Sequence, residues 1–158
     1  MKLSDFVVRN AMLPNLVATT KDAAIREMVE SLRASGQLQN TEQDNIVKAI
    51  MKREQLGSTG IGRGVAIPHT KHESVERLIG TVGVSHVGVP FESLDNEPVF
   101  ILVMLISPQD RPGEHLRALE SVSRHLRDDM FCRMLRQTTS AEAIWELLTE
   151  ADGHQPGR

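Results

Sequence analysis

Apolar side chains recur three or four residues apart along two segments of the first third of the chain, a spacing that predicts two amphipathic helices. The first segment covers residues 21–35 and is followed by Gly36, a candidate C-cap. The second segment begins at Thr41, a candidate N-cap, and stops at Gly57. A stretch of small residues over 57–64, GSTGIGRG, comes next and is typical of a glycine-rich turn.

Apolar and β-branched residues in the middle of the chain form short runs bounded by turn residues. These runs predict strands at 65–67, 78–85 and 99–107. The run at 99–107, VFILVMLIS, lacks the polar alternation of a half-exposed strand. We therefore expect it at the centre of a sheet, where it is buried on both faces.

Helical spacing returns in the final third of the chain and predicts helices at 112–127, 130–137 and 140–148. Asp110 is a candidate cap for the first of these helices, and Ser140 is a candidate cap for the last. The order of helices, then strands, then helices implies a sheet covered by helices, in either an α/β or an α+β arrangement.

Length and composition limit the architecture and the partners of the chain. With 158 residues, 40% of them hydrophobic, the chain is expected to form one domain over 1–151, followed by a frayed tail over 152–158. Aromatic residues make up 3% of the chain and the formal net charge is −3. We therefore expect neither a nucleic-acid binder that stacks bases on aromatic rings nor attraction to anionic lipid.

Cys132 is the only cysteine, which excludes an internal disulfide framework and a zinc site built from cysteines alone. No apolar run approaches the roughly 20 residues that span a bilayer. Residues 1–10 lack the basic and apolar segments of a signal peptide. The expectation is a soluble cytoplasmic protein without membrane insertion.

The residues best suited to chemistry cluster between Arg53-Glu54 and His69, with four glycines over 57–64. Glycine lets backbone amides approach an anion closely, and an arginine side chain can donate paired hydrogen bonds to a phosphoryl group. His69 follows a short apolar strand and Pro68, a rigid position that suits a reactive residue. A nucleophilic histidine must be neutral and held in one tautomer beside a group that stabilises anions.

These residues, written RE-x2-GSTG-x3-GVAIPH from Arg53 to His69, strongly resemble the fructose/mannitol/nitrogen-type enzyme IIA of the bacterial phosphoenolpyruvate-dependent phosphotransferase system (PTS). The resemblance covers nearly the whole chain. It includes the strand that ends at Ser107, the helix that opens with His115, and the closing helices. It implies an α/β fold in which a mixed β-sheet is flanked by helices on both faces.

The resemblance also implies roles for individual residues. His69 matches the phosphorylated histidine, which accepts a phosphoryl group from the phosphocarrier HPr. His115 matches the second active-site histidine, which is expected to approach His69, and Arg53 matches the active-site arginine. In sugar-transporting members the phosphoryl group then passes to a cysteine of a IIB protein, whereas nitrogen-type members regulate partners according to their phosphorylation state. No cofactor is expected.

Ser58 and Thr59 are candidates for binding the phosphoryl oxygens through hydroxyl or backbone groups, although they could equally shape the turn. The position of His115 at a helix start disfavours a second imidazolium there and favours an incoming phosphoryl group. A zinc site made of His69, His72 and His115 is a weak alternative, because His72 lies in a polar run and the usual metal pair on a helix face is spaced i, i+4. Metal-dependent hydrolysis fits poorly, because no cluster of acidic ligands accompanies the histidines.

The other candidate residues are given structural roles. His86, His125 and His154 are expected on the solvent side, and Cys132 is expected to be a small core residue, so no IIB function is assigned to this chain. Two hypotheses of function stay open: a PTS component that passes a phosphoryl group to a IIB protein, and a regulatory binding module controlled by phosphorylation. The motif is common to both, so neither a sugar nor a regulated partner follows from it.

Overall fold

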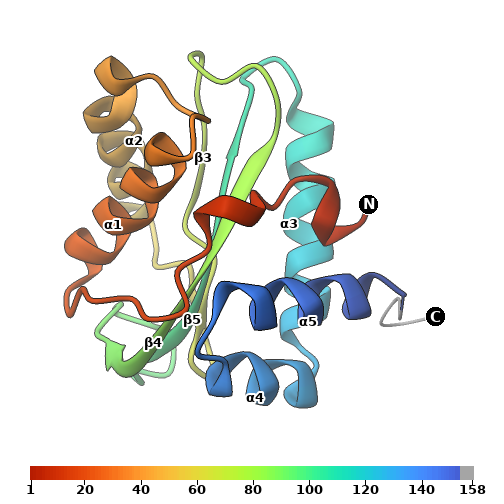
Figure 1. The fold of residues 1–158 in the computed structure, drawn as a ribbon. Coiled ribbons are helices and arrows are strands. Elements are labelled where there is room, and N and C mark those ends of the chain that lie inside the picture. Colours follow the sequence, from red (N-terminus) through yellow and green to blue (C-terminus); the bar gives the residue numbers. More distant parts are fainter. Residues whose placement is uncertain (154–158) are drawn as a thin grey trace.

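Two layers of helices enclose a mixed β-sheet in the computed structural model, which describes residues 1–153 (Figure 1). The helices are α1 (Lys21–Ala34), α2 (Gln43–Gln55), α3 (Pro112–Leu126), α4 (Asp129–Gln137) and α5 (Ala141–Gly153). Short 3₁₀ turns lie at Leu3–Asp5, Arg9–Ala11 and Asn40–Glu42. The strands are β1 (Gly60–Gly62), β2 (Val65–Ala66), β3 (His69–Lys71), β4 (Ile79–Val89) and β5 (Val99–Ser107). Within 1–153, no helix is both long and apolar enough to cross a membrane.

Strand β5 forms the centre of the sheet, which confirms the prediction from its unbroken apolar sequence. It pairs antiparallel with β4 along one edge and parallel with β2 and β3 along the other. Strands β2 and β3 lie end to end on that second edge, with Val65 opposite Ile101 and His69 opposite Leu105. Strand β1 extends the sheet as an antiparallel partner of β2. The central position buries residues 101–107 of β5.

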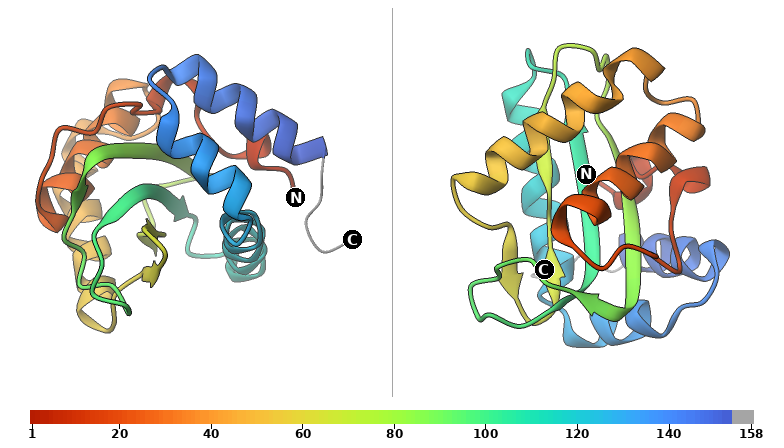
Figure 2. Two further views of the ribbon diagram at one scale, coloured as in Figure 1. Left: turned by 90° about the horizontal axis from the view of Figure 1, so that it is seen from below. Right: turned by 90° about the vertical axis from the view of Figure 1, so that its left-hand side faces the viewer.

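Each face of the sheet has its own hydrophobic core. Leu102 and Met104 of β5 belong to the core beneath α1 and α2, whereas Ile101 and Val103 belong to the core beneath α3, α4 and α5. The alternation follows from the two-residue period of a strand. Figure 2 shows the sheet lying between the two groups of helices. The α/β fold with helices on both faces, which the resemblance implied, is therefore confirmed.

Helix α2 does not begin at the predicted cap. Thr41 lies inside the 3₁₀ turn, and the helix starts at Gln43 without a side-chain capping bond. The turn supplies a backbone hydrogen bond of its own, from the N–H of Glu42 to the carbonyl of Gln39 at 3.0 Å. The 3₁₀ turn thus leads directly into α2 and takes the place that Thr41 was expected to hold.

The predicted caps of α3 and α5 have opposite outcomes. Asp110 makes no capping bond to α3, whose N-cap position is held by Arg111 and whose first residue is Pro112. Proline has no N–H to satisfy and is suited to the first helical position. Ser140, by contrast, caps α5 as predicted, since its Oγ accepts a hydrogen bond from the N–H of Ala143 at 3.1 Å.

The last helix runs further than predicted. It continues through Gly153, and Asp152, which was expected in a tail, is buried within it. The Asp152 carboxylate accepts hydrogen bonds from the N–H groups of Leu3, at 2.6 Å, and Ser4, at 3.1 Å. This contact joins the two ends of the domain, so the local pattern could not reveal it. The rest of the expected tail, 154–158 with its histidine, lies outside the described residues.

Candidate functional site

Two histidines from distant parts of the chain meet at one edge of β5. His69 is the first residue of β3, and His115 lies in the first turns of α3, which follows β5. Their ring centroids are 5.4 Å apart and the ring planes are tilted by 50°. The structure therefore brings together the two histidines that the sequence singled out, within reach of a single small group placed between them.

The hydrogen bond at the His69 ring determines which nitrogen is free. Its Nδ1 lies 2.6 Å from the carbonyl oxygen of Ile67. A carbonyl can only accept, so Nδ1 carries the proton and Nε2 keeps its lone pair. Burial lowers the pKa of His69; the Ile67 carbonyl opposes this shift, and the positive charge of Arg53 adds to it. The ring is thus a neutral imidazole whose Nε2 can act as a nucleophile.

His115 is also kept neutral. Its Nδ1 is hydrogen-bonded to the hydroxyl of Ser107, the last residue of β5, and the side chain is buried. Burial is the main cause that lowers the pKa of His115 to about 4. His69 in its protonated form, and Lys71, add to this shift because a positive charge nearby repels a second one. Because two imidazolium ions at this separation would repel each other, the pair favours a state in which both rings are uncharged.

Arg53 extends from the last turn of α2 toward the glycine-rich turn. Its Nη1 donates a hydrogen bond to the carbonyl of Gly57 at 3.2 Å, and the side chain is half-buried. In addition to burial, the positive charge of Arg53 lowers the pKa of the His69 ring. Since one nitrogen of the guanidinium is engaged, the other N–H donors of the planar group stay available to an anion.

The hydroxyls of Ser58 and Thr59 are used within the turn itself. Ser58 Oγ donates to the carbonyl of Phe91 at 2.7 Å and accepts from the N–H of Gly60 at 3.0 Å. Thr59 Oγ1 donates to the carboxylate of Glu54, and the Thr59 N–H lies 3.2 Å from both oxygens of the same group. In the structure both hydroxyls therefore help to shape the turn, the second of the two roles that the sequence left open for Ser58 and Thr59.

Glu54 is a buried carboxylate behind the site; the motif includes it, but sequence reasoning gave it no role. It forms an ion pair with Lys21 at 2.9 Å, and Lys21 in turn lies over the ring of Phe91 at 4.8 Å. The position of Glu54 holds a signal that could have found it: it continues the buried stripe of Val47 and Ile50 along α2. A carboxylate on an apolar helix face needs partners, and it obtains them here from Thr59 and Lys21.

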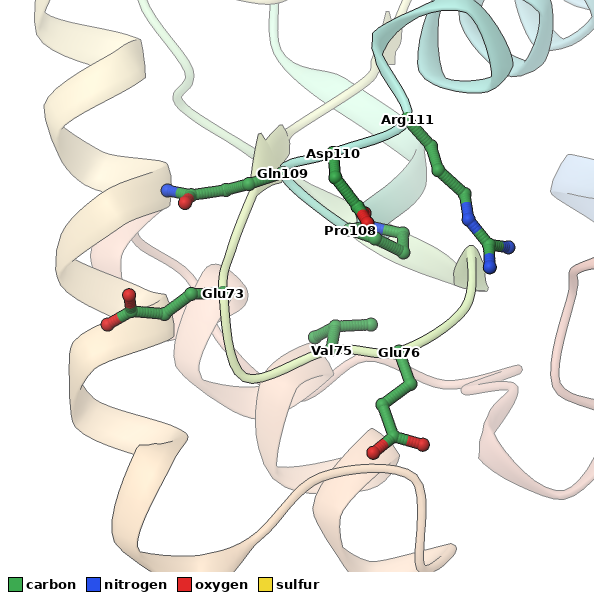
Figure 3. Close-up of a pocket in the computed structure, with 7 residues that line it drawn as sticks. All are labelled: Glu73, Val75, Glu76, Pro108, Gln109, Asp110 and Arg111. Atoms are coloured by element: carbon green, nitrogen blue, oxygen red, sulfur yellow. The ribbon is translucent and has the colours of Figure 1, made fainter.

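A pocket of about 400 Å³ lies next to the strand ends but excludes both histidines (Figure 3). Its lining is formed by Glu73, Val75, Glu76, Pro108, Gln109, Asp110 and Arg111. In Figure 3 the carboxylates of Glu73 and Glu76 point away from each other. With three acidic side chains and one basic one, this pocket repels a phosphoryl dianion. It is not the anion site that the sequence predicts.

The zinc alternative gains no support from the geometry. The ring of His72 is turned toward Ser74, whose Oγ lies 2.7 Å from His72 Nδ1. Across residues 1–153, no group of three or more histidine, cysteine, aspartate or glutamate side chains is placed to hold a metal ion.

The predictions for Cys132 and for the histidines expected on the solvent side have different outcomes. Cys132 is half-buried at the edge of the core beneath α3–α5, so the predicted core position is met in part, and burial raises the pKa of its thiol to about 11. His125, however, is not on the solvent side: it is buried on α3 and lies against Phe131, with ring centroids 5.9 Å apart. Contact between α3 and α4 removes it from water. His86 is exposed, as predicted.

Solved structures with this arrangement of sheet and helices define the class of protein. The crystal structure of nitrogen regulatory protein IIA-Ntr from Neisseria meningitidis aligns with a TM-score of 0.83 and 26% sequence identity, covering 92% of this chain and 98% of that chain. The crystal structure of IIA mannitol from Escherichia coli aligns with a TM-score of 0.73 and 25% identity, covering 89% and 96%. The fold is that of the PTS IIA components.

The sequence comparison gives the family. Residues 6–151 match the family "Phosphoenolpyruvate-dependent sugar phosphotransferase system, EIIA 2", and the chain belongs to it. A nitrogen regulatory protein of Bradyrhizobium diazoefficiens is 32% identical over 148 residues, which are 94% of this chain and 95% of that protein. The PTS system fructose-specific EIIABC component of Bacillus subtilis is also 32% identical, over 96% of this chain but only 24% of its own length.

Proposed function

We propose that the chain is a phosphohistidine carrier of the PTS, which accepts a phosphoryl group from an HPr-type phosphocarrier on Nε2 of His69. The observation that carries this proposal is the bond between His69 Nδ1 and the Ile67 carbonyl, because it leaves the lone pair on Nε2. Membership of the EIIA type 2 family supports the same assignment.

The transfer is balanced without a proton. The Nε2 lone pair of neutral His69 forms a new N–P bond while the N–P bond of the phosphorylated histidine on HPr breaks, and its electron pair returns to the donor ring. Donor and acceptor are both imidazoles, so the step is close to neutral in free energy. Catalysis therefore consists of alignment and of stabilising the charge on the three phosphoryl oxygens.

His115 and Arg53 supply those two contributions. The uncharged His115 ring, 5.4 Å from His69 between centroids, is placed to hydrogen-bond a phosphoryl oxygen and fix its direction. Arg53 adds a permanent positive charge that can donate two hydrogen bonds to the phosphoryl group. Ser58 and Thr59 take part through their place in the turn. Their hydroxyls are bound within the turn, and the Thr59 N–H is bound to Glu54, so any direct contact with phosphoryl oxygens falls to the Ser58 N–H.

The proposal is tested by phosphorylation of the purified chain with phosphoenolpyruvate, enzyme I and HPr. One phosphoryl group per chain is expected, labile in acid and stable in alkali, and His69→Ala should abolish it. His72→Ala is the matched control, because its ring is three residues away and turned to Ser74. Continued labelling of the His69→Ala protein would refute the assignment.

Two fates of the phosphoryl group remain to be distinguished: transfer to a cysteine of a IIB protein for sugar uptake, or control of protein partners. Similarity to nitrogen regulatory proteins along nearly the full chain favours regulation. Incubating the phosphorylated chain with the IIB proteins of the same organism separates the two. Rapid transfer supports the sugar pathway, whereas retention of the phosphoryl group supports regulation.

A further inference from the structure

A pocket lined by three arginines lies at the end of the sheet away from the histidine pair. Its volume is about 490 Å³, and its lining consists of Arg63, Asp129, Cys132, Arg133, Arg136 and Gln137. Arg63 immediately precedes Gly64 and β2, whose Val65 lies opposite Ile101, whereas His69 lies opposite Leu105. At a rise of about 3.3 Å per residue, these positions are about 13 Å apart along β5. The pocket is thus separate from the candidate phosphoryl-transfer site.

Arg63 is fixed in place by the helices beside it. Its Nη2 donates to the carbonyl of Leu126 at 3.0 Å, and its Nη1 lies 3.0 Å from the carboxylate of Asp129. The guanidinium therefore spans from the β1–β2 turn to the junction of α3 and α4. Arg63 forms one rigid wall of the pocket, and Asp129 offsets part of its charge.

Arg136 is held by an aromatic ring. Its guanidinium carbon lies 3.9 Å from the centroid of Phe100, on the second residue of β5. Stacking of this kind fixes the plane of the group but uses none of its five N–H donors. Neither Arg133 nor Arg136 has an ion-pair partner within residues 1–153. In a chain with a net charge of −3, two unneutralised cations therefore share one pocket.

We propose that this pocket binds a small organic phosphate, with the phosphate dianion held between Arg133 and Arg136 and the rest of the molecule over Cys132 and Gln137. A guanidinium matches the geometry of a phosphate and stays charged at every physiological pH. A volume of about 490 Å³ lies within the range of pockets that take small ligands. The site does not depend on the proposed transfer to His69, so a variant without that histidine keeps it.

Titration of the full chain with glycerol 3-phosphate, followed by ¹H–¹⁵N NMR, tests this proposal. Saturable shifts are expected at the amides of Arg63, Cys132, Arg133 and Arg136, and the same shifts should appear in His69→Ala. Inorganic phosphate should bind more weakly, because it lacks the part that covers Cys132. Equal affinity for the two probes, or shifts centred on His69, would overturn the proposal.

The variant Arg133→Ala/Arg136→Ala should weaken binding about 100-fold or more, since it removes the charged hydrogen bonds of both guanidinium groups to the phosphate. Both side chains are exposed, so the fold should persist, and urea unfolding checks this. Lys48→Ala/Arg117→Ala is the matched control, because it removes two exposed positive charges, from α2 and α3, outside the pocket. Arg136→Lys keeps the charge but loses the flat stack on Phe100, and it should weaken binding in part. If Lys48→Ala/Arg117→Ala weakened binding as much as Arg133→Ala/Arg136→Ala, only the overall charge would matter and the pocket would be disproved.

Discussion

The two ends of strand β5 handle positive charge in opposite ways. Near Leu105, buried His115 and half-buried His69 form a close pair, and loss of contact with water lowers the pKa of each ring. Near Phe100, Arg136 and its neighbours keep their charge because a guanidinium does not lose its proton in proteins. Burial can switch off the charge of an imidazole but not that of an arginine.

The two ends of β5 therefore suit different tasks, phosphoryl transfer at the histidine pair and anion binding at the arginine pocket. A nucleophile for phosphoryl transfer needs a lone pair, and the histidine end provides one by excluding the proton from His69 Nε2. An anion-binding pocket needs a lasting charge and no lone pair, and the arginine end provides that. Arg53 is the exception that joins the two, because it brings one permanent charge to the edge of the histidine site.

Removal of His115 should produce the largest change. His115→Ala should still accept phosphate on His69, but about 10²–10⁴-fold more slowly, since a positioned proton donor or hydrogen-bond partner contributes that much. His115→Asn should restore part of the rate by keeping a donor. Rapid-quench measurement of transfer from phosphorylated HPr gives the rates, and His86→Ala is the control. An unchanged rate in His115→Ala would make this histidine a packing residue.

Arg53→Lys should produce the next largest change. Lysine keeps the charge but loses the planar pair of donors, and a loss of about 2–3 kcal/mol in the transition state corresponds to roughly a 30- to 150-fold slower transfer. The free energy of unfolding should stay close to that of the parent, because Arg53 makes one hydrogen bond to Gly57. Arg111→Lys, outside the site, provides the control. Equal rates for Arg53→Lys and the parent would place the anion elsewhere.

Glu54→Gln should have a smaller effect on the rate and a clear effect on stability. The amide cannot accept on both sides from the Thr59 N–H and hydroxyl, and Lys21 loses its buried partner and keeps only exposed Glu92, at 3.9 Å. We expect the free energy of unfolding to fall by about 1–3 kcal/mol and transfer to slow about tenfold as the turn loosens. Adding Lys21→Met should recover part of the stability, because removing both charges costs less than removing one. No recovery in the double variant would argue against this ion pair as the anchor of the turn.

The sequence predicted the fold where apolar patterns were long. The helices at 21–35 and 112–127 and the strand at 99–107 appear close to their predicted bounds. Strands β1 and β3, with three residues each, were not predicted, because so short a run shows no period. Pairing with β2 and β5 creates them, and such pairing depends on the whole sheet.

The sequence predicted which residues form the candidate site but not how the polar side chains around them are buried. The motif singled out His69 and Arg53, the family resemblance singled out His115, and the structure places the two rings together. The spacing of Glu54 along α2 held a signal for its burial that was not used, whereas no pattern in the sequence revealed that His125 faces the core, since that depends on how α3 and α4 pack together. The chemical roles of these residues stay predictions until the transfer assays are made.

The smallest expected effect concerns stability against pH. The pKa of His115 is about 4 in the folded chain and near 6.5 when unfolded, so between these values the unfolded chain binds a proton that the folded chain does not. The free energy of unfolding must then fall as the pH falls through this window. The lowered pKa of His69 and that of buried His125 act with the same sign. Urea unfolding at pH 7, 6 and 5 should show the decline.

Variants at the two ends of β5 then separate their contributions. His115→Asn cannot take up the proton, so its stability should fall less steeply with decreasing pH than that of the parent. Arg136→Ala, at the other end, should leave the slope unchanged, because a guanidinium is charged in both states across this range. A steeper dependence in His115→Asn, or a slope altered by Arg136→Ala, would show that proton exclusion is not confined to the histidine end.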